Sequence, residues 1–182
     1  NGCRSMECPN CKGYQLEPKE LEPGLVAAVC SKCEGAMLPL MNYRYWLDSN
    51  GGISDEDTAG NVVEESDSAH VCPKCQRMMM KYRIGIESDN RLDLCAGCDE
   101  AWLDKGEWRL LKQLDLFDKL PTIFTDAWQN NIRQQWKENN KKERYEALIG
   151  ESDFKKLKEF KDWLDAHPEK ERMKQFVLMK TK

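Results

Sequence analysis

The sequence contains no long apolar segment. No run of apolar residues in the 182-residue chain approaches the length of about 18 that a membrane-spanning helix needs. The start of the chain also lacks the basic region followed by an apolar region that is typical of a secretory signal. We therefore expect no membrane partner and a location in the reducing cytoplasm.

Positive charge is scarce in the first part of the chain. Residues 1–104 contain 10 Lys and Arg against 18 Asp and Glu, a net charge of −8, whereas residues 105–182 contain 18 against 14, a net charge of +4. Nucleic-acid binding depends largely on Lys and Arg side chains that displace counterions from phosphates. The first part is therefore a poor surface for nucleic acid, and any basic patch would lie in the C-terminal part.

Cysteine, in contrast, is abundant, with nine in the chain. Disulfides are rare in the cytoplasm, where closely spaced cysteines more often bind metal ions. Eight of the nine form four Cys-x2-Cys pairs, with 18 residues between the first and second pairs and 19 between the third and fourth. Both separations are typical of zinc sites. The predicted metal ligands are Cys8, Cys11, Cys30 and Cys33 in one site and Cys72, Cys75, Cys95 and Cys98 in the other.

The coordination chemistry of zinc explains this pattern. Zn²⁺ binds four thiolates at about 2.3 Å in a tetrahedron, and two cysteines three residues apart on a tight turn can point the same way. Four cysteines leave no coordination position for water or substrate, so we predict two structural Zn²⁺ ions per chain, no other cofactor and no catalytic residue. Each cysteine-containing module is too small to fold on apolar burial alone, and structural zinc contributes roughly 10–16 kcal/mol.

The four cysteine pairs allow more than one arrangement. Sequential pairing closes short loops, whereas crossed pairing must also order the segment between the modules, so loop entropy favours the sequential sites. The cross-braced arrangement is the alternative. An iron ion held by four thiolates is an alternative to zinc. The number of residues between the cysteine pairs disfavours iron.

Hydrophobic residues make up 40% of the chain and charged residues 33%, so one large core is not expected. We predict a small metal-stabilised fold, in which two tandem four-cysteine zinc ribbons with short antiparallel β-hairpins precede an α-helical region. The offset of 64 residues between Cys8 and Cys72 indicates an internal repeat. The expected boundaries are 8–48 for the first ribbon, 49–71 for an acidic flexible linker, 72–104 for the second ribbon and 105–182 for about four helices.

The C-terminal part has helical periodicity. We expect helices over about 105–119, from an N-cap at Thr125 toward Ile149, over about 152–166, and from Pro168 onward. Residues 137–144 carry no apolar anchor. The second helix is therefore either exposed in its middle or broken there.

One stretch resembles a known family. Residues 72–75 (Cys-Pro-Lys-Cys) and 95–98 (Cys-Ala-Gly-Cys), followed by 102–107 (Trp-Leu-Asp-Lys-Gly-Glu), closely resemble the bacterial zinc-ribbon family named after the zinc finger of transcription factor IIB. The resemblance implies a ribbon with four cysteine ligands and a tail that leads into a helix, and the family name suggests a role in transcription. The first ribbon matches in cysteine spacing. Its Trp-Leu-Asp, at 46–48, lies nine residues later than the family pattern and lacks the Gly-Glu, so we interpret it as a diverged copy.

The tail after the last cysteine has a structural interpretation. We expect Trp102 and Leu103 to cover one face of the ribbon and Asp104 to cap the following helix, with Glu107 reaching back as in a capping box. No nucleophile, histidine pair or phosphate-binding loop accompanies these two acids. A catalytic role is therefore not predicted, and the protein is not expected to be an enzyme.

Two further residues stand apart from the cysteine pairs. Cys3 is the ninth cysteine, without a partner in the pattern, and we expect a free terminal thiol. His70 lies two residues before Cys72, and we expect an exposed loop histidine, with a supporting or substitute role at the metal as the alternative.

Three functions are compatible with these patterns. The favoured one is a non-enzymatic zinc-binding adaptor that binds another protein, because six tryptophans exceed what a small core needs and tryptophan is common at binding hot spots. The second is a nucleic-acid-binding zinc-ribbon protein, which the acidic charge disfavours. The third is a dithiol redox protein, for which a thioredoxin-like βαβ setting is missing. No small-molecule substrate is expected.

Overall fold

A computed structural model describes residues 6–49 and 69–180. The chain divides into two compact units, residues 1–133 and 134–182. Cys3 lies outside the described residues, and so does nearly all of the predicted linker. Among the described helices, none has both the length and the apolar character needed to cross a membrane.

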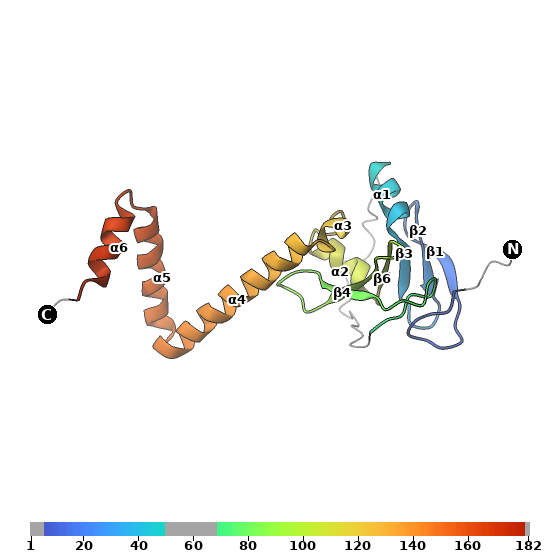
Figure 1. Cartoon of the computed structure of the whole chain (residues 1–182), viewed down its shortest axis with the longest axis horizontal. Coiled ribbons are helices and arrows are strands. Elements are labelled where there is room, and N and C mark those ends of the chain that lie inside the picture. The colour runs from blue at the N-terminus through green and yellow to red at the C-terminus, as the bar shows by residue number, and fades with distance from the viewer. Residues whose placement is uncertain (1–5, 50–68, 181–182) are drawn as a thin grey trace. The chain divides into compact units, whose positions relative to one another are not determined.

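The first unit is built on one six-stranded sheet in which every pair of neighbouring strands is antiparallel. The strand order is β1-β2-β3-β6-β5-β4 (Figure 1). The strands are β1 (Leu16–Glu22), β2 (Leu25–Cys30), β3 (Ala36–Pro39), β4 (Met80–Arg83), β5 (Arg91–Cys95) and β6 (Glu100–Leu103).

The sheet consists of two copies of the same succession of elements. Each copy runs from a cysteine pair through two strands, a second cysteine pair and a third strand to a helix, which is α1 (Leu40–Asp48) in the first and α2 (Glu107–Gln113) in the second. The third strands, β3 and β6, pair with each other and place Met37 opposite Trp102. The sequence predicted two ribbons but not that they form one sheet. In two separate ribbons, β3 and β6 would be edge strands with unpaired backbone N–H and C=O groups, and their pairing satisfies these groups.

Alternation along the strands gives the sheet two apolar faces. In β6, Ala101 and Leu103 belong to the core beneath the helices, whereas Trp102 belongs to the core around the cysteines. On the helical side, Trp46 of α1 and Trp108 of α2 meet with ring centroids 6.0 Å apart at 66°. Trp46 and Trp108 are therefore buried in this core and are not part of an exposed docking surface.

The helices that follow the sheet differ in length from the expectation. The helix expected over 105–119 ends at Gln113, and the short α3 (Leu120–Ile123) follows. The next helix, α4 (Asp126–Ile149), begins where the Thr125 Oγ1 atom accepts a 3.2 Å hydrogen bond from the Trp128 N–H, which is the predicted N-cap. It runs unbroken through residues 137–144, whose side chains are nearly all exposed.

The second unit contains the C-terminal half of α4, with α5 (Glu151–Ala166) and α6 (Lys170–Leu178). Leu164 is its one buried hydrophobic side chain among the described residues. The aromatic side chains of Trp163 and Phe176 are 54% and 73% exposed. The described part of this unit therefore has almost no core of its own and leaves large apolar side chains in contact with solvent.

Candidate metal centres

The structure brings the eight predicted cysteines together as two groups of four. All sulfur atoms within a group lie within 4.8 Å of one another. The sulfurs of Cys8 and Cys33 are 3.6 Å apart, and those of Cys75 and Cys95 are 3.5 Å apart. In a tetrahedral zinc site with 2.3 Å bonds, neighbouring sulfurs are about 3.8 Å apart. The groups are Cys8, Cys11, Cys30 and Cys33, and Cys72, Cys75, Cys95 and Cys98, so the pairing is sequential.

Each cysteine pair contributes one buried and one partly exposed sulfur. Cys8, Cys30, Cys72 and Cys95 are buried, and the second member of each pair is half-buried. All eight are free thiols. The first cysteine of a pair also accepts hydrogen bonds from the turn that follows it: the Cys8 sulfur from the backbone N–H groups of Asn10 and Cys11, and the Cys72 sulfur from those of Lys74 and Cys75. These donors stabilise negative charge on sulfur, which suits a thiolate ligand.

Three of the four turns close in the same strained way. The residue after the second cysteine adopts a left-handed conformation, with φ of 58° at Glu34, 61° at Gln76 and 56° at Asp99. Its N–H donates to the carbonyl of the first cysteine at 2.8–2.9 Å in each case. None of the three is glycine, so each turn carries backbone strain that the surrounding structure compensates.

The pKa values of the thiols differ within each group. Burial raises the pKa of the Cys8 thiol to about 11 and also raises that of Cys33. A hydrogen bond from the Arg77 backbone N–H lowers the pKa of Cys75 to about 7. Four adjacent sulfurs cannot all be ionised without a compensating charge, and a divalent soft metal ion provides it. The donor set and the sulfur spacing therefore fit a tetrahedral metal ion in both groups.

A partly buried polar network links the first group to the second half of the sheet. Asn10, between Cys8 and Cys11, donates from Nδ2 to Asp104 Oδ1 at 3.0 Å. The same oxygen accepts the indole N–H of Trp102 at 2.8 Å. A buried indole N–H requires such an acceptor. The network therefore fixes the orientation of Trp102 between the two groups of cysteines.

The position of His70 differs from the expectation. The sequence predicted an exposed loop histidine, but His70 is 2% exposed. Its Nδ1 lies 2.9 Å from Asp93 Oδ2, and its Nε2 bonds with Asn10 Oδ1. Both ring nitrogens are engaged, so His70 supplies no ligand atom to either group. The prediction failed because His70 packs against Trp102, with ring centroids 5.9 Å apart, a contact that sequence spacing does not reveal.

The tail of the second ribbon is arranged differently from a full capping box. The Asp104 N–H donates to Glu107 Oε2 at 2.8 Å, as predicted for the Glu107 half. The Asp104 carboxylate, however, accepts from Trp102 and Asn10, and the residue at the N-cap of α2 is Gly106. Burial raises the pKa of Glu107 to about 8. The acids of this tail are thus structural partners of buried donors.

In the first ribbon, the segment that corresponds to residues 102–104 is not the Trp-Leu-Asp at 46–48. The stretch 46–48, which repeats the Trp-Leu-Asp of 102–104, ends helix α1. The strand that pairs with β6 is β3, in which Met37 stands opposite Trp102 and joins the same core. A shared Trp-Leu-Asp was therefore a misleading marker of structural equivalence.

Asn10 and Asp93 are the site residues that the sequence did not identify, whereas His70 was singled out with a supporting role as the alternative. Asn10 occupies the third position of a Cys-x2-Cys turn, where the corresponding residue of the third turn is Lys74, which forms an ion pair with Glu100 of β6. In both turns this position reaches toward β6 or its tail. A comparison of the two turns in the sequence would have singled out Asn10 and Lys74, but it would not have identified Asp104 and Glu100 as their partners.

Comparisons of the chain with protein-family models, with curated proteins and with solved structures find no match. The fold and the two groups define a small protein with an antiparallel sheet that carries two potential four-cysteine metal sites. Its structure fits a metal-stabilised fold.

Proposed function

We propose that the chain is a zinc protein in which both ions are structural, and that it acts as a non-enzymatic adaptor for another protein. The observation that carries the zinc assignment is the pair of four-sulfur groups, each closed by cysteines alone. Four thiolates favour zinc over hard cations and leave no open coordination position for a reaction. The zinc-ribbon resemblance of residues 72–107 agrees with this assignment.

The adaptor role rests on the second unit. Apolar side chains along α5 and α6 are exposed, including Leu157 at 53%, Phe160 at 42% and Trp163 at 54%. A groove of about 400 Å³ between these helices is lined by apolar side chains apart from Arg172. Contiguous apolar surface of this kind is typical of protein-binding sites, and aromatic residues often dominate their binding energy.

Metal analysis of the purified full chain tests the zinc assignment. We expect two zinc atoms per chain, one in Cys30→Ser and one in Cys95→Ser, with loss of the circular dichroism signal of the sheet after exhaustive chelation. A wild-type protein that keeps its structure with no bound metal would contradict the proposal. A protein purified with iron in place of zinc would correct the identity of the ion.

Affinity capture from native cell extract tests the adaptor role. The wild-type protein should retain a partner in amounts that Phe160→Ser and Trp163→Ser strongly reduce. Tyr45→Ser on α1 removes a comparably exposed aromatic ring from the first unit and serves as the control. Equal capture by all three variants would place the docking surface elsewhere.

A further inference from the structure

A second surface of the helical unit carries uncompensated positive charge. Lys137, Lys141, Lys142 and Arg144 on α4 and Lys158 on α5 are exposed, and none of them forms an ion pair within residues 69–180. Two other lysines of α5 do form such pairs: Lys156 with Asp153 and Lys161 with Asp165, both at 3.0 Å. In a chain with a net charge of −4, this concentration of unpaired cations is distinctive.

Three of these cations, Lys141, Lys142 and Lys158, line an apolar groove between α4 and α5. The groove has a volume of about 690 Å³. Its apolar lining consists of Tyr145, Ile149, Phe154 and Leu157. Its charged lining contains the bases Lys141, Lys142, Lys158 and Lys161 against the acids Glu138 and Asp162. The groove thus combines an apolar floor with a mainly basic rim.

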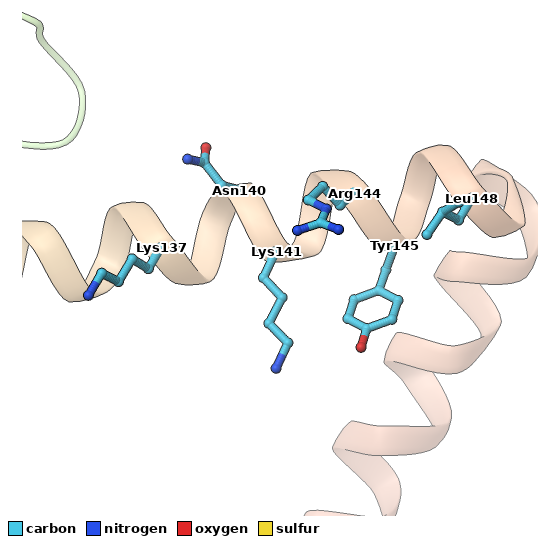
Figure 2. Close-up of a pocket in the computed structure, with 6 residues that line it drawn as sticks. All are labelled: Lys137, Asn140, Lys141, Arg144, Tyr145 and Leu148. Carbon is cyan, nitrogen blue, oxygen red and sulfur yellow. The ribbon is translucent and has the colours of Figure 1, made fainter.

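A second hollow continues this surface along α4. It has a volume of about 510 Å³ and shares Lys141 and Tyr145 with the groove. Figure 2 shows these two side chains projecting from the same side of α4. The hollow also includes Lys137 and Arg144, so its cations lie along residues 137–144 of α4, and its apolar side chains, Tyr145 and Leu148, follow them.

We propose that this groove binds an acidic amphipathic peptide segment of a partner protein, whose apolar side chains enter the floor while its carboxylates meet the basic rim. The proposal rests on the adaptor function and names the chemistry of its partner. Charge complementarity selects the occupant, because unpaired cations around an apolar floor lower the free energy of an acidic ligand and raise that of a basic one. The volume accommodates two or three large side chains, the number of anchors that an amphipathic helix presents in a groove.

The composition of the groove disfavours single-stranded nucleic acid as its occupant. Ile149 and Leu157 offer no flat surface on which a base stacks, and Tyr145 and Phe154 are its only two aromatic rings. The whole of residues 134–182 carries 13 Lys and Arg against 10 Asp and Glu, a net charge of only +3. Phosphate backbones bind through many cations, and the ten acids of this unit offset most of its thirteen cations.

A peptide selection on the zinc-loaded full chain tests the proposal even while the partner is unidentified. We expect a random 16-residue displayed library to yield peptides with net negative charge and apolar residues spaced three or four apart. A selected peptide, labelled and titrated by fluorescence anisotropy, should bind more weakly as salt is added. Selection of neutral or basic peptides, or of none, would overturn the proposal.

Charge-reversal variants locate the binding site. Lys141→Glu/Lys158→Glu should weaken binding of the selected peptide at least tenfold. The matched control Lys155→Glu/Lys170→Glu changes the net charge equally at exposed lysines outside the groove and should change the affinity less than twofold. Equal weakening by both pairs would overturn the assignment to the groove.

Two further measurements separate this proposal from its rivals. A labelled 20-residue oligothymidine should bind at least tenfold more weakly than the selected peptide; tighter binding that depends on Lys141 and Lys158 would assign the groove to nucleic acid instead. If wild type and Lys141→Glu/Lys158→Glu captured a native partner equally, the groove would not be its binding site, and the adaptor function would still stand. The zinc content, measured on the same samples, reports on the metal assignment separately.

Discussion

Asn10 and Asp104 are 94 residues apart in the chain, yet the Asn10 Nδ2 atom donates a 3.0 Å hydrogen bond to Asp104 Oδ1. Asn10 lies inside a cysteine turn of the first group, and Asp104 directly follows the last strand of the second half. Together with the β3–β6 pairing, this bond makes the two candidate metal centres parts of one structure.

Replacement of Asn10 by alanine should weaken both centres. The change removes one donor to the Asp104 carboxylate, which keeps the Trp102 indole N–H, and leaves the buried His70 Nε2 atom without its partner, at a cost of about 1–3 kcal/mol. We expect a lower midpoint of thermal unfolding and faster release of both zinc ions to a chromogenic chelator. Lys12→Ala, an exposed neighbour on the same turn, should leave both unchanged. Loss of zinc from the first site alone would show that the centres are independent.

Gly35 permits the close approach of Trp102. A β-carbon at Gly35 would overlap the six-membered ring of the Trp102 indole, which is fully buried and has no room to withdraw. Gly35→Ala should therefore destabilise the protein by about 1–3 kcal/mol in chemical denaturation, the usual cost of overpacking. At Gly85 a β-carbon meets nothing within 4 Å, so Gly85→Ala is the matched control and should change stability by much less. Similar values for the two variants would contradict the packing described for Trp102.

The left-handed residue at position 76 offers a stabilising change. Gln76 has φ of 61° directly after Cys75, a conformation in which glycine avoids the clash of a β-carbon. We expect Gln76→Gly to raise the free energy of unfolding by about 0.5–1 kcal/mol and the β-branched Gln76→Val to lower it, measured with zinc in excess. The reverse order of stabilities would show that the turn is not strained.

Glu107 should make stability depend on pH. Burial raises its folded-state pKa from 4.5 to about 8, so the folded protein retains a proton that the unfolded chain has lost. The free energy of unfolding should fall because of this group as the pH rises from about 4.5 to 8, and then level off. Glu107→Gln removes the titration, so the difference in stability between variant and wild type should grow in favour of the variant across this range.

Protonation of the cysteine ligands acts in the opposite direction at low pH, because thiols must lose protons to bind zinc. The comparison therefore uses urea denaturation of zinc-saturated wild type and Glu107→Gln over a pH range of about 6 to 9, where the ligand contribution is common to both. Parallel curves for the two proteins would show that Glu107 does not titrate in this window.

Local features were predictable from the sequence because they depend on few neighbouring residues. Two cysteines three apart share one turn, so their convergence follows from short-range geometry, and the separations of 18 and 19 residues indicated which pairs meet. Thr125 capped α4 as expected, since a cap needs only the next three residues. The sequence left open whether the helix of residues 126–149 is continuous and exposed in its middle or interrupted there, because residues 137–144 contain no apolar side chain.

The partners of the buried polar side chains depended on tertiary structure. Asp104 looked like a helix cap, and it became the acceptor for Trp102 and Asn10 because the fused sheet places an unsatisfied indole N–H beside it. His70 was expected in solvent and is buried against Asp93 for the same reason.

The sequence by itself thus determined the two sets of four sulfurs, the β-hairpins that carry them and the helical character of the C-terminal part. Only the tertiary structure decided that the two halves share one sheet, that β3 rather than residues 46–48 corresponds to β6, and that cations gather around a groove between α4 and α5. The physical reason is range. Turns and caps are set by the free energies of adjacent residues, whereas strand pairing, burial and grooves depend on contacts between segments distant in sequence, which no local pattern encodes.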